Sequence, residues 1–341
     1  MTTSTERLNA RLLHQPVDRV PNMTLVMQYA ADLINAPLAS YYQDYEVLCE
    51  ANFKSVEVYG LDILDAISDP YRETADYGAT IEFPPNSLPV CKAPRLQNPD
   101  DLASLPTPDP NKPGSRMRDR VDAIRLFHER AGGQVPIQGW VEGALAEAAD
   151  LRGVTAIMYD LYDRAEWLEE LLEHCVETAI NFAVAQVEAG ATIIGLGDAI
   201  ASQVGPRAYR RFALPYEQRI FQAVRDAGAI PRLHICGDTT RIVKDMAHSG
   251  AQIIDLDWQV DLAQARAEVD AIDPDIALCG NFDPVAILLD GTPDTVTQAV
   301  GTCYAAGGDN WLAAPGCEVP RYTPAENVLA LRDALVLDGK G

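Results

Sequence analysis

The sequence predicts an α/β protein whose fold is a (β/α)8 TIM barrel. Three observations support this fold class. The chain has 341 residues, of which 48% are hydrophobic, and this length suits one large barrel with additions. Short apolar runs recur along it, and most of them are separated by helical patterns, an alternation typical of a parallel sheet. Eight such runs in one chain indicate a sheet that closes on itself.

The apolar runs and the helical patterns between them define the expected elements in order. The expected strands are residues 23–26, 60–64, 135–140, 192–196, 231–235, 252–256, 276–280 and 311–314. Helices are expected at 165–189, 206–227, 239–249, 262–272 and 292–306. The alternative is an open doubly wound sheet. Because neither GxGxxG at a strand–helix junction nor GxxxxGK[ST] occurs, no pattern supports a nucleotide-binding version of it.

The first part of the chain interrupts this rhythm. An N-terminal extension precedes the first strand, and residues 69–109 are rich in proline. Within them, TIEF (80–83) and LPVCKAP (88–94) predict a small β-hairpin. We therefore expect a single domain over 1–341, in which 69–109 form an insertion near the barrel mouth.

The charge of the chain limits the classes of molecule that it can bind. The chain has 27 basic and 50 acidic residues and a net charge of −23, which excludes binding to nucleic acid or to an anionic membrane through bulk electrostatics. The N-terminus lacks the apolar segment of a signal peptide, and no run approaches the roughly 20 apolar residues of a membrane span. We expect a cytoplasmic protein whose seven cysteines are reduced.

The strongest chemical signal is RLHICGD at residues 232–238. His234 and Cys236 are two apart at the end of an expected strand, so their side chains share a face. Cys317 lies just after the last expected strand, in AAPGCEVP. Since the carboxyl ends of parallel barrel strands meet at one mouth, the three side chains could bind one metal ion. Cys279 is a competing ligand, although a cysteine in an apolar run is more typical of a core.

One imidazole and two thiolates suit Zn²⁺, and three protein ligands leave a fourth position open, as in catalytic sites. The two thiolates already cancel the charge of the ion. A substrate thiol at the fourth position would lose its proton yet stay electron-rich, which favours attack by sulfur on a methyl carbon. A hydrolytic zinc site usually has more histidine and carboxylate ligands.

Polar residues follow other expected strands as well. Glu142 and Asp198 are candidate catalytic groups, either as acceptors of the thiol proton or as an extra ligand in the absence of substrate. Asp257 and Asn281 are candidate substrate-binding groups. Each could instead be a helix cap, Asp198 and Asn281 especially.

Several of these stretches resemble the uroporphyrinogen decarboxylase-like superfamily, in its cobamide-dependent methyltransferase branch. The similar stretches are ERLNARLLHQPVDRVP (6–21), GLGDAIASQVGPRAYRRFALPYEQRI (195–220), LHICGDTT (233–240), GNFDP (280–284) and APGCEVPRYTPAEN (314–327). Zinc-binding members have a His-x-Cys motif and a distant Cys, which match His234, Cys236 and Cys317. The family fold is a (β/α)8 barrel, in agreement with the strand count, and the family suggests a homodimer.

The resemblance implies methyl transfer between a methylcobamide and a thiol, for which coenzyme M is the prototype. The sulfur would attack the methyl group in line and release the reduced cobalt. Because no Asp-x-His-x-x-Gly motif surrounds any of the five histidines, we expect a separate corrinoid protein to present the methylcobamide.

Three alternatives remain: an O-demethylase acting on a methoxylated compound, a uroporphyrinogen decarboxylase, and a non-catalytic zinc protein. Decarboxylases carry an arginine-bearing segment near the N-terminus, whereas NMTLVMQYAAD (22–32) has no arginine. The demethylases of this branch use a more carboxylate-rich zinc site.

Overall fold

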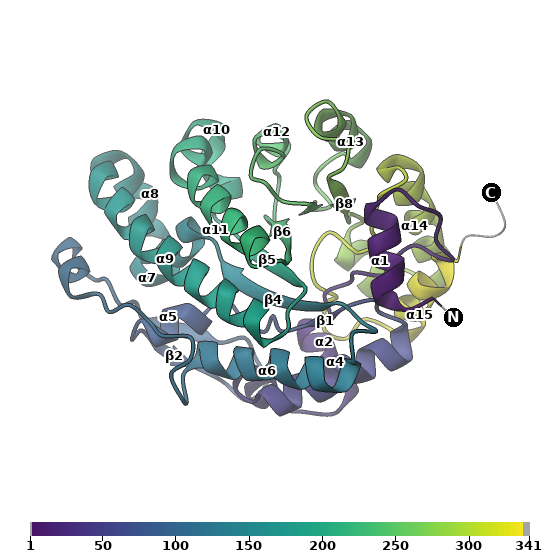
Figure 1. The fold of residues 1–341 in the computed structure, drawn as a ribbon, viewed down its shortest axis with the longest axis horizontal. Helices are drawn as coiled ribbons and strands as arrows, with labels where there is room; N and C mark the ends of the chain where they lie inside the picture. Colours follow the sequence, from purple (N-terminus) through teal and green to yellow (C-terminus); the bar gives the residue numbers. More distant parts are fainter. Residues whose placement is uncertain (1, 337–341) are drawn as a thin grey trace.

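The computed structural model describes residues 2–336, and its centre is a curved, parallel six-stranded sheet (Figure 1). The strand order is β1-β4-β5-β6-β7-β8. The bounds are Leu64–Asp65 for β1, Ile137–Glu142 for β4, Ile193–Gly197 for β5, Ile230–His234 for β6, Ile253–Asp255 for β7 and Ala277–Cys279 for β8. Helices lie around the outside of the sheet, so the chain has the α/β, TIM-barrel-like architecture that the alternation predicted.

Two further segments connect the edge strands β1 and β8. The amide of Leu312 donates to the carbonyl of Leu278 at 2.9 Å, next to β8. Ala313 forms a parallel bridge with Asn22, whose carbonyl accepts from the amide of Asp62 at 2.8 Å, next to β1. Backbone hydrogen bonds therefore continue from β8 to β1 through these two segments.

The expected strands at 23–26 and 311–314 are the two that the structure does not form as strands. Isolated bridges take their place, and Pro21 and Pro315 flank them. Proline has no amide hydrogen to donate, so a regular ladder cannot extend through these positions. The other six expected strands are present, with ends displaced by up to four residues.

Fifteen α-helices are described in residues 2–336. They are α1 (Ser4–Leu12), α2 (Met27–Leu33), α3 (Leu38–Gln43), α4 (Tyr45–Tyr59), α5 (Arg72–Asp76), α6 (Arg116–Ala131), α7 (Ala144–Arg152), α8 (Val154–Asp163), α9 (Ala165–Ala189), α10 (Ala201–Phe212), α11 (Leu214–Asp226), α12 (Val243–Met246), α13 (Leu262–Asp270), α14 (Pro293–Gly307) and α15 (Ala325–Ala334). A 3-10 helix (Pro99–Ser104) and a π-helix (Pro284–Leu289) complete the set.

Two expected helices differ from the observed ones. The helix expected at 206–227 is divided into α10 and α11, because Ala213 leaves the helical conformation and a proline follows at the start of α11. The helix expected at 239–249 is reduced to α12. The carboxylate of Asp238 accepts from the amide of Thr240 at 3.0 Å, which favours a turn there over a helix start.

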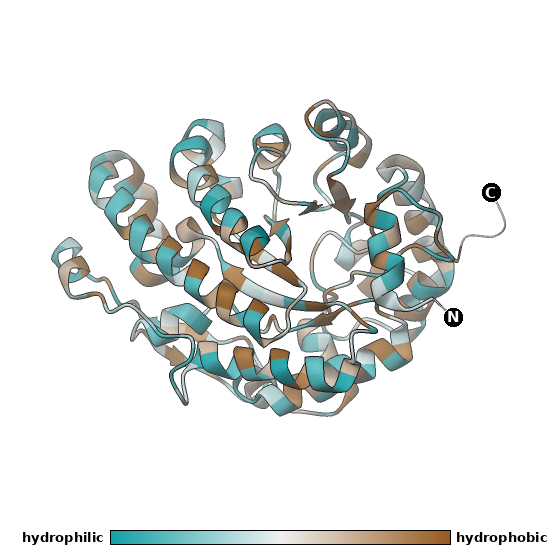
Figure 2. Ribbon diagram, in the orientation of Figure 1, coloured by the Kyte–Doolittle hydropathy of each residue, from teal (hydrophilic) through white to brown (hydrophobic). Residues whose placement is uncertain are grey.

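Helix α1 covers the end of the sheet at which the strands begin, opposite their carboxyl ends. Its Leu8 packs in an apolar cluster with Met23, Ile63, Ile193 and Ile253, all buried. Figure 2 shows the same pattern more widely, with hydrophobic residues on the strands and on the helix faces turned toward them. Burial of this apolar surface is the main stabilising contribution, at about 25 cal/mol per Å².

The proline-rich segment contains an antiparallel hairpin of β2 (Thr80–Glu82) and β3 (Val90–Ala93). The loop between these strands contacts the loop that follows Cys317: Nη1 of Arg321 donates to the carbonyl of Asn86 at 3.2 Å.

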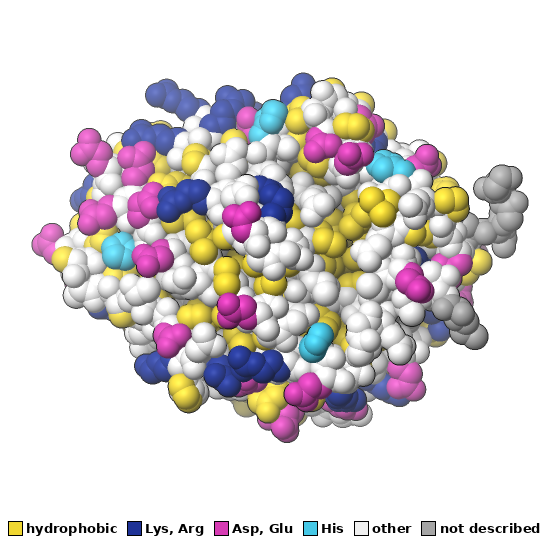
Figure 3. All heavy atoms as spheres, viewed as in Figure 1, with side chains coloured by type: hydrophobic (Ala, Val, Ile, Leu, Met, Phe, Trp, Pro, Cys, Tyr) yellow, Lys and Arg dark blue, Asp and Glu magenta, His cyan; other side chains and the backbone are white. Residues whose placement is uncertain are grey.

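Acidic and basic side chains are interspersed on the face shown in Figure 3, so patches of both signs accompany the net charge of −23. Within residues 2–336, none of the helices combines the length and the apolar character needed to cross a membrane.

Candidate metal centre

Strand β6 brings the first two predicted ligands to the carboxyl end of the sheet. Its last residue, His234, lies opposite Gly197 of β5. The chain then turns at Gly237, whose φ of 90° suits glycine. The amide of Gly237 donates to Oδ2 of Asp257 at 2.9 Å. This hydrogen bond holds the turn that places Cys236 beside the imidazole of His234.

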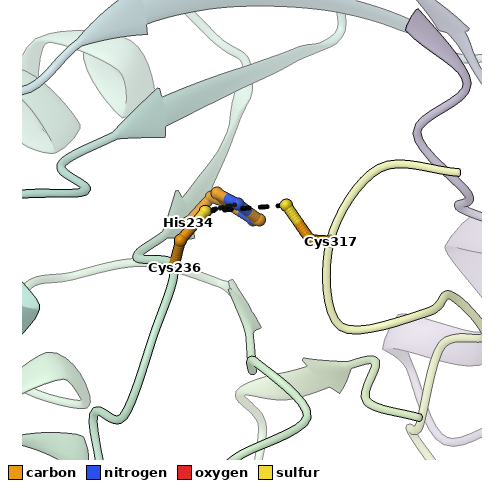
Figure 4. A group of neighbouring side chains, drawn as sticks. All are labelled: His234, Cys236 and Cys317. Carbon is orange, nitrogen blue, oxygen red and sulfur yellow. Dashed lines mark hydrogen bonds between the residues drawn. The ribbon is translucent and has the colours of Figure 1, made fainter. Parts of the chain in front are cut away.

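Cys317 reaches the same place from the loop after the last expected strand. The amide of the preceding Gly316 donates to the carbonyl of Phe282 at 2.9 Å. A Cβ atom on Gly316 would lie 2.4 Å from the amide nitrogen of Trp258, so the two loops approach this closely only because residue 316 is glycine. Figure 4 shows the side chain of Cys317 pointing across the site toward Cys236.

The three predicted ligands converge. Nε2 of His234 is 2.9 Å from Sγ of Cys236, and the two sulfur atoms are 3.7 Å apart. All three donor atoms lie within 4.8 Å of one another. Two sulfur atoms bound at about 2.3 Å to one tetrahedral ion would be about 3.8 Å apart. The two sulfur atoms already have this spacing.

Cys279, the competing ligand, lies outside this group. It is buried in β8, and its Sγ is 3.5 Å from Nη2 of Arg232. No other trio of His, Cys, Asp or Glu side chains in residues 2–336 has a geometry suited to a metal ion.

The trio is electrostatically coupled. Burial opposes protonation of His234, but the charge of Cys236 and hydrogen bonds to Asp255 and both cysteines raise its pKa well above the ordinary value. The hydrogen bond between the sulfurs raises the pKa of Cys236 and lowers the pKa of Cys317 to about 4. The contact between the sulfurs therefore favours ionisation of Cys317 over ionisation of Cys236, and binding of a cation would displace the remaining thiol proton.

Asp255 is a residue of the candidate site that the sequence analysis missed. It lies opposite His234 in the neighbouring strand β7, and its Oδ2 is 2.9 Å from Nδ1 of the imidazole. Metal-binding histidines commonly donate their second ring nitrogen to a carboxylate in this way. The alignment of β6 with β7 is the signal that could have identified it.

Glu142 ends strand β4 and also lies opposite Gly197. Gly197 has no side chain, and a Cβ there would lie 3.1 Å from the indole of Trp140 and 3.2 Å from Oε2 of Glu142. The indole of Trp140 also packs beside the imidazole of His234, with ring centroids 5.8 Å apart. Nη2 of the buried Arg72 donates to Oε1 of Glu142 at 2.6 Å. Burial raises the pKa of Glu142 well above its ordinary value, and the charge of Arg72 opposes this shift.

Asp198, the other candidate catalytic carboxyl group, lies elsewhere. Its fully buried side chain packs against Gly143 at the start of α7, where a Cβ would be 2.6 Å from the carboxyl carbon. Burial and the charge of Glu217 on α11 raise its pKa well above the ordinary value. Asp198 therefore faces the helical layer, away from the two cysteines.

The predicted substrate-binding residues both contact loop backbone. Nδ2 of Asn281 donates to the carbonyls of Asp257 (3.0 Å) and Val260 (2.6 Å). The carboxylate of Asp257 accepts from the amides of Gly237 (2.9 Å) and Gln259 (3.0 Å). These bonds shape the loops around the trio, and direct contact of either residue with a substrate stays a prediction.

Glu318 is a second residue that the sequence analysis missed. It directly follows Cys317, and its Oε1 accepts from Nε2 of Gln28 at 3.4 Å. Burial and the charge of Cys317 raise the pKa of its carboxyl group to about 7. Only its position next to a candidate ligand could have indicated it.

Known proteins resemble this chain over nearly its whole length. The family model for uroporphyrinogen decarboxylase (URO-D) matches residues 3–336. The methylcobamide:CoM methyltransferase MtbA of Methanosarcina acetivorans is 29% identical over 332 residues, which cover 96% of this chain and 95% of that protein. A uroporphyrinogen decarboxylase of Alkalilimnicola ehrlichii is 29% identical over 353 residues, with 97% and 93% covered.

The solved structure of a methyltransferase from Methanosarcina mazei has a TM-score of 0.88 to this chain at 28% identity and covers 98% of both. Because methyltransferase and decarboxylase relatives are equally identical in sequence, the overall identity does not separate the two activities. The residues of the site must do so.

Proposed function

The chain belongs to the uroporphyrinogen decarboxylase (URO-D) family, and within it we propose that this protein is a zinc-dependent methyltransferase. It moves a methyl group between a corrinoid (methylcobamide), presented by a separate protein, and a thiol such as coenzyme M. The observation that carries the proposal is the convergence of His234, Cys236 and Cys317 on one point at the carboxyl end of the sheet.

The donor set fits zinc. One imidazole nitrogen and two sulfurs are ligands that Zn²⁺ prefers, and three of them leave one tetrahedral position for substrate. When bound, the ion would hold the substrate thiol as a thiolate and so activate its sulfur as a nucleophile. His234, Cys236 and Cys317 would orient this sulfur toward the mouth, where the methyl group arrives.

We assign the acceptance of the thiol proton to Glu142 rather than to Asp198. Glu142 and His234 both lie opposite Gly197 at the carboxyl end of the sheet, and Oε2 of Glu142 lies over that glycine. Burial increases its affinity for a proton, while the ion pair with Arg72 keeps it able to ionise, the balance required of a general base. Asp257 and Asn281 would shape the entrance through the loops that they hold.

The same residues weigh against a decarboxylase. Residues 22–32 contain no arginine for the carboxylates of a tetrapyrrole. Gln28 of this segment instead contacts Glu318, an acidic residue next to the trio. The tetrapyrrole substrate of a decarboxylase carries eight carboxylates, and acidic residues beside the trio would repel it.

The experiment is zinc analysis combined with X-ray absorption at the zinc edge, on the wild-type protein with and without coenzyme M. We expect one zinc per chain, bound by one nitrogen and two sulfurs, with a third sulfur after addition of the thiol. Folded wild-type protein without zinc would refute the proposal and favour the decarboxylase. If zinc is present but gains no sulfur ligand when coenzyme M is added, the result would instead favour an O-demethylase or a non-catalytic zinc site.

A further inference from the structure

We propose that four buried side chains below the metal centre position His234 for the metal. They are Asp65 on β1, Gln138 on β4, Arg232 on β6 and Asp255 on β7, and we call them the polar layer. The inference rests on the proposed function only in that the trio of His234 and the two cysteines binds a metal ion.

The polar layer is a continuous chain of hydrogen bonds across four strands. Nε2 of Gln138 donates to Oδ2 of Asp65 at 2.6 Å. Nη1 of Arg232 donates to Oε1 of Gln138 at 3.0 Å, and its Nε donates to Oδ1 of Asp255 at 2.8 Å. Oδ2 of Asp255 then contacts Nδ1 of His234 at 2.9 Å. The chain of contacts ends at the imidazole that contacts Cys236.

The layer is placed where a barrel would usually be apolar. Arg232 is 1% exposed and Gln138 is fully buried. They lie opposite Ile253 and Ile193, two members of the apolar cluster, in the neighbouring strands. A buried ion pair seldom stabilises a fold more than well-packed hydrophobic side chains of similar volume do. Stability is therefore a poor explanation for this layer, and orientation of the group above it is a better one.

The geometry shows what the layer would control. Nε of Arg232 contacts both oxygens of Asp255, at 2.8 and 3.1 Å, and so restricts rotation of the carboxylate. With one ring nitrogen of His234 held by Asp255, the other is directed to the sulfurs, as a metal ligand requires. The guanidinium also balances the carboxylate, so the pair adds no net charge beneath a centre that already contains two thiolates.

The test compares zinc affinity in wild-type protein and in the Arg232→Met variant, measured by competition with a chromophoric chelator. Arg232 acts on His234 through Asp255, so we expect affinity to fall by up to roughly 10–100-fold, the usual cost of losing the direct partner of a metal ligand. The absorption spectrum of the Co²⁺-substituted variant should also shift, because the imidazole is reoriented. Gln138→Leu, one step further from the metal, should lower affinity in the same direction by less, and it is the variant to measure if Arg232→Met does not fold.

Arg152→Met is the matched control. Arg152 on α7 forms a partly buried ion pair with Asp160 on α8 at 3.0 Å, in the helical layer. Its loss should reduce thermal stability without a change in zinc affinity or in the cobalt spectrum. If Arg232→Met behaves like this control, the polar layer is only structural and the inference is overturned, while the proposed function stands. Wild-type protein that binds no zinc would instead refute the proposed function itself.

Discussion

The carboxyl ends of strands β5 and β6 look equivalent in sequence and differ in the structure. Each strand is followed by a polar residue that chemical reasoning singled out, Asp198 after β5 and the pair His234 and Cys236 at β6. The side chains of His234 and Cys236 meet Cys317 at the mouth. The side chain of Asp198 is fully buried against the start of α7.

The parity of strand positions explains this difference. Gly197 is the residue of β5 that lies opposite His234, so Gly197 and His234 share a level and a direction. Asp198 is one residue further, and successive side chains of a strand point to opposite faces. Cys236 is two residues beyond His234 and returns to the inner side. A polar residue at a strand end is therefore a site candidate only when its parity matches that of a known inward neighbour.

The largest expected effect is on zinc affinity, and it distinguishes the site at the end of β6 from Asp198 after β5. Cys317→Ala removes a ligand, so zinc affinity should fall by more than the roughly 10–100-fold typical of an outer partner, and methyl transfer should be lost with it. Asp198→Asn should retain wild-type zinc affinity. Metal analysis after dialysis against a chelator measures both. Equal zinc loss in the two variants would show that Asp198 belongs to the metal centre and that the parity argument is wrong.

The side chain of Glu142 points to the same face of the sheet as that of His234, whereas the side chain of Asp198 does not. The next largest expected effect is the loss of activity when Glu142 is replaced. Glu142→Gln removes the proton acceptor but keeps the size of the side chain. The rate of methyl transfer from methylcobalamin to coenzyme M should fall roughly 10²–10⁴-fold, the usual contribution of a general base. Zinc content should not change.

Glu147→Gln is the control for this prediction. Glu147 is also buried and its Oε2 accepts from Thr74 at 3.1 Å, but it lies on α7 rather than on a strand. Its activity should match the wild type. Equal rates for Glu142→Gln and wild type would exclude Glu142 as the acceptor of the thiol proton.

Parity and strand alternation also show how far the sequence could predict this molecule. The alternation identified six of the sheet strands, and the His-x-Cys spacing with a distant cysteine identified a trio that converges. Arg232 is two residues before His234, so parity could have placed it inside the sheet. Arg72 could not be found in this way, because it begins the short helix α5 rather than lying on a strand, and it reaches Glu142 only through tertiary packing.

The smallest expected effect concerns what Asp198 does in the helical layer. It lies near Glu217, whose pKa burial raises to about 8 and whose Oε2 accepts from the hydroxyl of Tyr209 at 2.6 Å. In the unfolded chain these carboxyl groups ionise near pH 4 to 4.5. Between that range and about pH 8, the folded state holds protons that the unfolded state has lost, so the free energy of unfolding must decrease as pH rises.

Glu217→Gln removes this ionisation, so the variant should become more stable relative to the wild type as pH increases from 5 to 8. The gain is on the order of a few kcal/mol at most, since one pKa unit corresponds to about 1.4 kcal/mol. Urea unfolding of both proteins at several pH values measures it. Other buried carboxyl groups, Glu142 among them, also contribute to the pH dependence of the wild-type stability, and the comparison of the two proteins cancels their contribution.

Glu173→Gln, which breaks an exposed ion pair with Arg219, is the control and should leave the pH dependence of stability unchanged. Parallel stability curves for Glu217→Gln and wild type would contradict this prediction. They would mean that Glu217 is ionised in the folded protein, despite its burial near Asp198.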